Sequence, residues 1–168
     1  MRTLNRSRLP YMFTGAMASS YYGRPRTTLD IDIVLTVEEK DLARLAKALT
    51  RADLRVQTQR LRSAWSSDYR IFTCEDTNSP HTLDIIFTDR PLERKVGRIL
   101  GLPTYYQTPE SLILAKLRML KVTIQSERAA TDREDIKAIL KATRVNLPSL
   151  RKRTSSEHTS AILDELTS

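Results

Sequence analysis

Three aspartates stand among apolar residues at spacings that suit metal binding. Asp30 and Asp32 alternate with apolar residues in the segment 29–35, and Asp84 lies between apolar residues further along the chain. Side chains two apart on a strand point to the same side, and carboxylates that close repel each other unless a cation lies between them. Mg²⁺ (or Mn²⁺) takes oxygen ligands and bridges nucleotide phosphates. If the two strands are neighbours, we expect Asp30, Asp32 and Asp84 to hold a metal; the alternative is a solvent-facing sheet surface.

A turn of small residues precedes these aspartates. Thr14 and Gly15 follow a short apolar strand and lead into a helix start, where unpaired backbone N–H groups can bind an anion. Glycine lets a ligand approach the backbone closely. We expect Gly15 and Ala16 to contact nucleotide phosphates, with Ser19 in the same helix and Arg26 in the following loop within reach of a triphosphate. By itself, such a turn is more simply explained as a strand-to-helix connection.

Charged residues also occur within helical patterns in the second half of the chain. Lys116 lies in the apolar run 112–117, where a lysine either extends to solvent or neutralises a buried anion. Asp132 and Asp135 follow Thr131 at an expected helix start, where the helix dipole and capping favour acidic residues. The pattern alone favours a structural role for the two aspartates and leaves the role of Lys116 open.

The elements that must position these residues follow from the hydrophobic patterns. Two helices are expected to begin at capping-box sequences, one at Thr36 with Glu39 and one at Thr131 with Glu134. The expected strands are 11–13, 29–35, 54–59, 69–74 and 82–87, the expected helices are 16–22, 36–49, 109–124, 131–140 and one near the C-terminus, with a loop at 125–130 and a polar stretch at 151–157. We therefore predict a single α+β domain, with a mixed β-sheet and packed helices at about 11–90 and a helical C-terminal part at about 108–168.

The composition narrows the choice of partners. The 168 residues carry a net charge of +8 and a pI of about 9.9, which favours an anionic partner such as RNA or a nucleotide. A single cysteine, Cys74, rules out an intrachain disulfide, and the two histidines lie far from it, which argues against a zinc site. No apolar segment is long enough to span a membrane, and the basic N-terminus lacks the apolar region of a signal peptide, so we expect a cytoplasmic protein without a membrane partner.

The ordered set of Gly15-Ala16, Asp30-x-Asp32 and Asp84 resembles the nucleotidyltransferase superfamily with the polymerase-beta-like fold. In that pattern a glycine is followed by Gly or Ser, then by D-x-D, and then by an acidic residue on a later strand. Three stretches are similar to the AbiEii and MenT toxin group and related small nucleotidyltransferases: TGAMAS with YGRPRTTLDID, PESLILAKL, and Arg128-x3-Asp132-x2-Asp135. The matches span about residues 11–142.

The resemblance implies a Mg²⁺-dependent enzyme that moves a nucleoside monophosphate from an NTP onto an acceptor. RNA of the tRNA kind is the expected acceptor because it suits the positive charge, and the toxin group implies a toxin role with an antitoxin protein as partner. By the same resemblance, Asp30 and Asp32 bind the metal, and Asp84 completes the site and helps to deprotonate the acceptor hydroxyl. Lys116 and Asp132 belong to the active site, and Lys116 also contacts the nucleotide.

Two alternatives stay open. The same chemistry can act on a protein or a small molecule, or the chain can be a catalytically inactive binding or regulatory module of the same fold. Retention of all three acids argues against an inactive module. Its best support is Ala16, which stands where the superfamily pattern has Gly or Ser.

Overall fold

The computed structural model describes residues 1–123 and 127–167, and these form two compact units. The first unit comprises residues 1–17 and 27–107, and the second comprises 18–26 and the described residues from 108 onward. Helix α2 (Gly15–Tyr22) begins in the first unit and ends in the second. The chain therefore leaves the first unit for only nine residues before returning to it.

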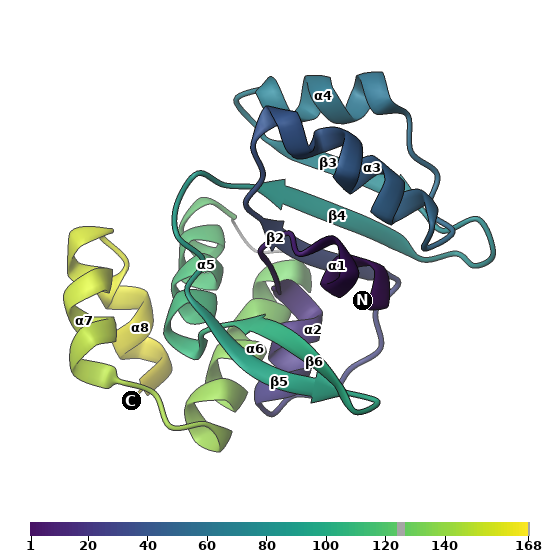
Figure 1. Ribbon diagram of the computed structural model, residues 1–168. Coiled ribbons are helices and arrows are strands. Elements are labelled where there is room, and N and C mark those ends of the chain that lie inside the picture. Colours follow the sequence, from purple (N-terminus) through teal and green to yellow (C-terminus); the bar gives the residue numbers. More distant parts are fainter. Residues whose placement is uncertain (124–126, 168) are drawn as a thin grey trace. The chain divides into compact units, whose positions relative to one another are not determined.

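The first unit is built on a mixed sheet of six strands in the order β3-β4-β2-β1-β6-β5 (Figure 1). The strands are β1 (Tyr11–Phe13), β2 (Asp30–Leu35), β3 (Ile71–Glu75), β4 (Thr82–Phe87), β5 (Arg94–Ile99) and β6 (Leu102–Gln107). The neighbours β2–β4 and β1–β6 are parallel, and the other pairs are antiparallel. The expected α+β fold with a mixed sheet is confirmed, as is the hairpin of β3 and β4.

Alternation along the central strands makes the two faces of the sheet chemically different. Alternate residues of β4 are buried, and the paired strand β2 repeats this pattern from Ile33 onward. The helices of this unit are α1 (Arg2–Ser7), α3 (Leu42–Thr50) and α4 (Thr58–Ser66). They cover the apolar face (Figure 1) through buried leucines that include Leu4, Leu49 and Leu61. Each fully buried leucine contributes about 1.5–3 kcal/mol, so the apolar face anchors the sheet and the other face is left for polar residues.

The second unit is helical. Its helices are α5 (Pro109–Val122), α6 (Glu127–Ala142), α7 (Leu147–Ser156) and α8 (Ser160–Thr167), together with the end of α2. Its core consists of side chains that are at most 1% exposed, among them Leu112, Ile113, Leu117, Ile136, Ile139, Leu150 and Leu163. Gly23 lets the end of α2 approach α6, because a Cβ atom there would lie 2.5 Å from that of Ala142. None of the described helices is both long and apolar enough to cross a bilayer.

The predicted strand at 54–59 is wrong. Only Leu54 makes an isolated β-bridge, and the chain then enters helix α4. Leu61 is fully buried in that helix, and the indole N–H of Trp65 donates to the carbonyl of Val37 at 3.0 Å. The short apolar alternation was therefore outweighed by the burial of one helix face.

Neither predicted capping box starts a helix. The hydroxyl of Thr36 is buried without a hydrogen-bond partner, and α3 begins only at Leu42 after a 3₁₀ turn. Thr131 lies inside α6, which begins at Glu127. Residues 127–130, expected in a loop, are therefore helical; the rest of that loop and the expected helix end at 124 lie outside the described residues. The polar stretch at 151–157 is also mostly helical, as part of α7.

The hairpin of β5 and β6 was missed by the sequence analysis. Its turn residues Leu100 and Gly101 both have positive φ, 48° and 77°. Such two-residue turns are usually marked by Asn-Gly or Asp-Gly, and Leu-Gly carries no such signal. The hairpin extends the sheet beyond residue 90 and brings Gln107 to Thr14, whose hydroxyl donates to Gln107 Oε1 at 2.5 Å.

Candidate active site

Asp32 and Asp84 occupy matching positions on the parallel strands β2 and β4. The register pairs Asp32 with Asp84 and Asp30 with Thr82, so all four lie on the face opposite the buried apolar one. Asp32 and Asp84 are half-buried, whereas Asp30 is exposed. Like charges directly opposite each other destabilise a sheet, so two carboxylates at one register position favour a bound cation. Their oxygen atoms are the donors that a hard divalent cation such as Mg²⁺ takes.

Threonine hydroxyls bind two of the three acids on this face. Thr82 donates to Asp30 Oδ1 at 2.7 Å, and Thr73 on β3 donates to Asp84 Oδ1 at 2.5 Å. Within residues 1–123 and 127–167, no three His, Cys, Asp or Glu side chains are grouped so as to hold a metal ion. The structure thus brings the three acids onto neighbouring positions of one sheet face, and a site made by all three carboxylates stays a prediction.

The glycine turn lies directly against Asp32. The amide of Thr14 donates to the carbonyl of Asp32 at 3.0 Å, and Gly15 follows with a φ of +54°. A Cβ atom on Gly15 would lie 2.2 Å from Asp32 Oδ2, too close for any real contact. Ala16, the next residue, is buried at 4% exposed, so its methyl group is part of the core. Position 15 therefore requires glycine for two reasons, its backbone conformation and the approach of the carboxylate.

Cys74 lies on the apolar side of the same sheet region. It is 2% exposed, as expected for a small buried hydrophobe. Burial, with a smaller contribution from the nearby Asp84 carboxylate, raises the pKa of its thiol to about 12. The thiol is therefore not a nucleophile at neutral pH.

A second charged cluster lies inside the helical unit. Lys116 on α5 is 6% exposed, and its ammonium donates to Asp132 Oδ1 at 2.6 Å and lies 2.8 Å from Asp135 Oδ2. Arg24 completes the cluster, since its Nη1 donates to Asp135 Oδ1 at 2.7 Å. Lys116 thus neutralises buried anions and does not extend to solvent.

Asp135 is the centre of this cluster. Burial raises the pKa of Asp135, but hydrogen bonds from Lys116 and Arg24 outweigh that effect and hold its pKa below the ordinary value. Arg26 Nη2 lies 3.8 Å from Asp135 Oδ2. Ser19 is fully buried and close enough to contribute to the lowered pKa, although its hydroxyl makes no hydrogen bond of good geometry.

No family model matches the chain, and no curated protein does. Solved structures do. The crystal structure of ANT(2'')-Ia in complex with adenylyl-2''-tobramycin is 18% identical, covers 94% of this chain and 93% of that chain, and has a TM-score of 0.67. The solution structure of the antibiotic-resistance factor ANT(2'')-Ia is 16% identical over 99% of this chain and 93% of that chain, with a TM-score of 0.66.

A third structure is that of an antigenic nucleotidyltransferase-like protein from Paracoccidioides brasiliensis. It is 15% identical, covers 95% of this chain and 87% of that chain, and has a TM-score of 0.62. The chain has the nucleotidyltransferase fold. This confirms the fold expected from the glycine turn and the aspartates, and it supports the expectation of a nucleotidyltransferase enzyme.

The predicted site residues of this nucleotidyltransferase fold fall into two groups. The first unit contains the metal-site acids and the glycine turn, namely Asp30, Asp32, Asp84, Gly15 and Ala16, and the second contains Ser19, Arg26, Lys116 and Asp132. Within each unit the structure brings the predicted residues together.

Asp135 and Arg24 were not among the predicted site residues. The sequence did carry a signal for Asp135, because Asp132 and Asp135 share one face of α6 with the buried Ile136 and Ile139. Acids on a buried helix face require a basic partner. Arg24 had no such signal, since it follows a helix in an irregular segment.

Proposed function

We propose that this chain is a divalent-metal-dependent nucleotidyltransferase that transfers a nucleoside monophosphate from an NTP to an acceptor. One observation carries this proposal. On a sheet with the nucleotidyltransferase fold, Asp32 lies opposite Asp84 and directly against the Gly15 turn. The same pair of carboxylates that would hold the metal therefore adjoins the backbone turn that would receive phosphate.

The proposed reaction forms a bond between an acceptor oxygen and the α-phosphorus of the NTP and breaks the bond to the bridging oxygen, so that pyrophosphate leaves. Asp30, Asp32 and Asp84 would hold Mg²⁺ or Mn²⁺, which supplies charge neutralisation for the triphosphate. Asp84 would accept the proton of the acceptor hydroxyl. The backbone of Gly15 and Ala16, without a side chain at position 15, would leave room for phosphate oxygens.

The helical unit would complete the nucleotide site. Lys116, Arg26 and Ser19 are proposed to contact the nucleotide, and Asp132 to fix Lys116, to which it is hydrogen-bonded. The buried pairing of Lys116 with Asp132 and Asp135 is also sufficient to explain why these residues are charged. A catalytic role for Lys116 and Asp132 is therefore a separate claim from their role in stability.

RNA is the acceptor that we propose. Support comes from the net charge of +8 and from the sequence resemblance to the toxin group. A small-molecule acceptor is the second candidate, favoured by the structural likeness to ANT(2'')-Ia, which was solved with adenylyl-2''-tobramycin. The two acceptors differ in charge, because an aminoglycoside is a cation and RNA a polyanion, so a strongly basic chain favours RNA.

Labelled NTPs test the proposal directly. The protein is incubated with each of the four NTPs and Mg²⁺, in separate reactions with total RNA, protein extract and tobramycin. Label on RNA is expected, label on tobramycin or protein would replace the acceptor, and Asp32→Asn should abolish transfer in every case. Transfer by Asp32→Asn at the wild-type rate would contradict the proposed site, and the absence of both transfer and Mg²⁺-dependent NTP binding would leave an inactive module.

A toxin role with an antitoxin partner is the finer proposal from the same resemblance. Expression of the wild-type chain should then arrest bacterial growth, and expression of Asp32→Asn should not. Growth arrest by both forms would separate toxicity from nucleotide transfer, and growth of both would remove the toxin role.

A further inference from the structure

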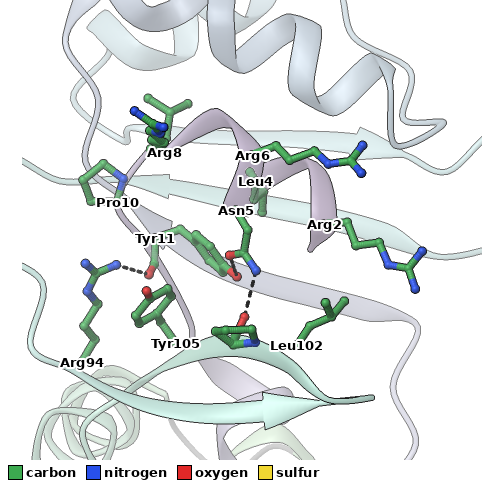
Figure 2. Close-up of a pocket in the computed structure, with 12 residues that line it drawn as sticks. Arg2, Leu4, Asn5, Arg6, Arg8, Pro10, Tyr11, Arg94, Leu102 and Tyr105 are labelled. Carbon is green, nitrogen blue, oxygen red and sulfur yellow. Dashed lines mark hydrogen bonds between the residues drawn. The ribbon is translucent and has the colours of Figure 1, made fainter.

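A pocket of about 680 Å³ lies between α1 and the β5–β6 hairpin. Arginine side chains from both elements line it, and the rings of Tyr11 and Tyr105 lie between the elements (Figure 2). The arginines are Arg2, Arg6, Arg8 and Arg94. All four are exposed to solvent, and no acidic residue lines this pocket.

A second pocket, of about 710 Å³, lies on the α3 side of the same segment. Arg6 and Arg8 line this pocket too, so the two hollows adjoin. Three further cations, Arg44, Lys47 and Arg51, come from α3, and again no acidic residue contributes. We call the combined surface the basic groove; its cations are Arg2, Arg6, Arg8, Arg44, Lys47, Arg51 and Arg94.

The α3 cations form one stripe. Arg44, Lys47 and Arg51 follow each other at spacings of three and four residues, so they lie along one side of the helix. Within the described part of the chain, Arg44 pairs with Asp41 at 3.1 Å, and neither Lys47 nor Arg51 has an ion pair. Elsewhere on this unit, comparable cations are neutralised locally, as Arg55 is by Glu75 at 2.9 Å. An uncompensated row of cations is costly by mutual repulsion and is relieved by a bound polyanion.

Arg94 is held in place before any ligand arrives. Its Nη1 donates to the carbonyl of Tyr11 at 3.1 Å, and its guanidinium lies 4.1 Å from the centre of the Tyr105 ring. Figure 2 shows Arg94 beside both tyrosines. A guanidinium carries five N–H donors, so these contacts leave donors for an oxyanion at a reduced entropic cost.

We propose that the basic groove binds the phosphate backbone of RNA. Six of its seven cations are arginines, whose planar guanidinium pairs with phosphate through two hydrogen bonds. The surface is also concave, which suits a strand that enters it better than a flat lipid surface. This choice of partner rests on the proposed function, because RNA is the acceptor proposed for the enzyme.

The basic groove is separate from the carboxylate face. Helices α1 and α3 cover the apolar side of the sheet, through Leu4 and Leu49 near Ile33, whereas Asp32 lies on the other side of β2. An RNA bound in the groove must therefore be long enough to pass the sheet edge before its reacting end meets the acids. The groove thus selects long RNA over mononucleotides and short oligonucleotides.

Salt-dependent RNA binding tests this proposal without any transfer reaction. The dissociation constant of a fluorescent single-stranded RNA is measured by anisotropy over a range of salt for wild type and for R44Q/K47Q/R51Q. The matched control is R55Q/R60Q/R62Q, which removes the same charge from exposed positions of the same unit. We expect the groove variant to lower the slope of log K against log salt by about 2, from about 0.7 per lost phosphate contact, and the control to change it far less.

Each outcome decides the matter. Equal loss in both triple variants would show that net charge alone attracts RNA and would overturn the groove. Binding of anionic phospholipid vesicles by wild type but not by the groove variant, with RNA binding unchanged, would replace RNA by a membrane. Asp32→Asn should bind RNA like wild type, so failed transfer with intact, groove-dependent binding would refute the proposed chemistry and retain the groove. Thermal unfolding of each variant checks that it is folded.

Discussion

Gly15 and Asp32 are so close that a Cβ atom at position 15 would lie 2.2 Å from the Asp32 carboxylate. The two residues belong to different elements, the start of α2 and strand β2, and are joined by the hydrogen bond from the Thr14 amide to the Asp32 carbonyl. The empty side-chain position at Gly15 is therefore part of the candidate active site. It keeps the carboxylate and the backbone turn together on one side of the sheet.

Gly15→Ala is expected to disable the site. The left-handed φ of +54° costs a residue with a side chain about 1–2 kcal/mol, and the new methyl group must displace Asp32. Gly101→Ala is the matched control, because Gly101 also has a positive φ, +77°, but a Cβ atom there meets nothing within 4 Å. Both variants should lose stability in urea unfolding, and only Gly15→Ala should lose NTP binding. Equal NTP binding by the two variants would contradict the role of Gly15.

Asp32→Asn and Asp84→Asn should have opposite effects on stability with and without metal. Without divalent ions, each substitution removes a like-charge repulsion across β2 and β4 and should stabilise the fold by a few tenths of a kcal/mol, up to about 1. With Mg²⁺ at about 100 times its dissociation constant, wild type should gain about 2.7 kcal/mol and the variants far less. Thermal unfolding in EDTA and in Mg²⁺ measures both effects. A wild-type midpoint indifferent to Mg²⁺ and Mn²⁺ would contradict the metal site.

Lys116→Met should destabilise the helical unit strongly. It leaves the carboxylates of Asp132 and Asp135 buried without their ammonium partner, a change that typically costs 3–5 kcal/mol, roughly. Lys121→Met is the control, because Lys121 is exposed on the same helix, and such surface changes stay within about 0.5 kcal/mol. Urea unfolding followed by circular dichroism compares the two. Similar midpoints would show that the buried cluster contributes little to stability.

The stability of the protein should fall in acid partly through Asp135. Its pKa is lower in the folded than in the unfolded chain, so its contribution is fully present above the unfolded value of about 3.9 and is lost as pH falls through the folded pKa. Asp135→Asn should therefore unfold at a midpoint that depends less on pH below about pH 4 than the wild-type midpoint does. Urea midpoints measured from neutral to acid pH provide the comparison, and parallel curves for the two proteins would exclude Asp135 as a source of acid lability.

Local patterns predicted the candidate site well where each residue's environment depends on near neighbours. The alternation around Asp30, Asp32 and Asp84 identified strands with one polar face, and the small residues at Gly15 identified a turn. Patterns failed where a distant contact outweighed them, as at 54–59, where the burial of Leu61 favoured a helix. They also failed at the β5–β6 turn, whose Leu-Gly sequence gives no hairpin signal.

By itself, the sequence determined the acidic strand face, the glycine turn and the basic charge, because side-chain periodicity and composition are local properties. Only the tertiary structure decided that β2 and β4 are parallel neighbours in a register that places Asp32 opposite Asp84. Only it showed that Asp135 shares Lys116 with Asp132, and that α1 gathers cations from α3 and the hairpin into one groove. Strand order, register and helix packing depend on contacts between residues far apart in the chain, and no local pattern encodes those contacts.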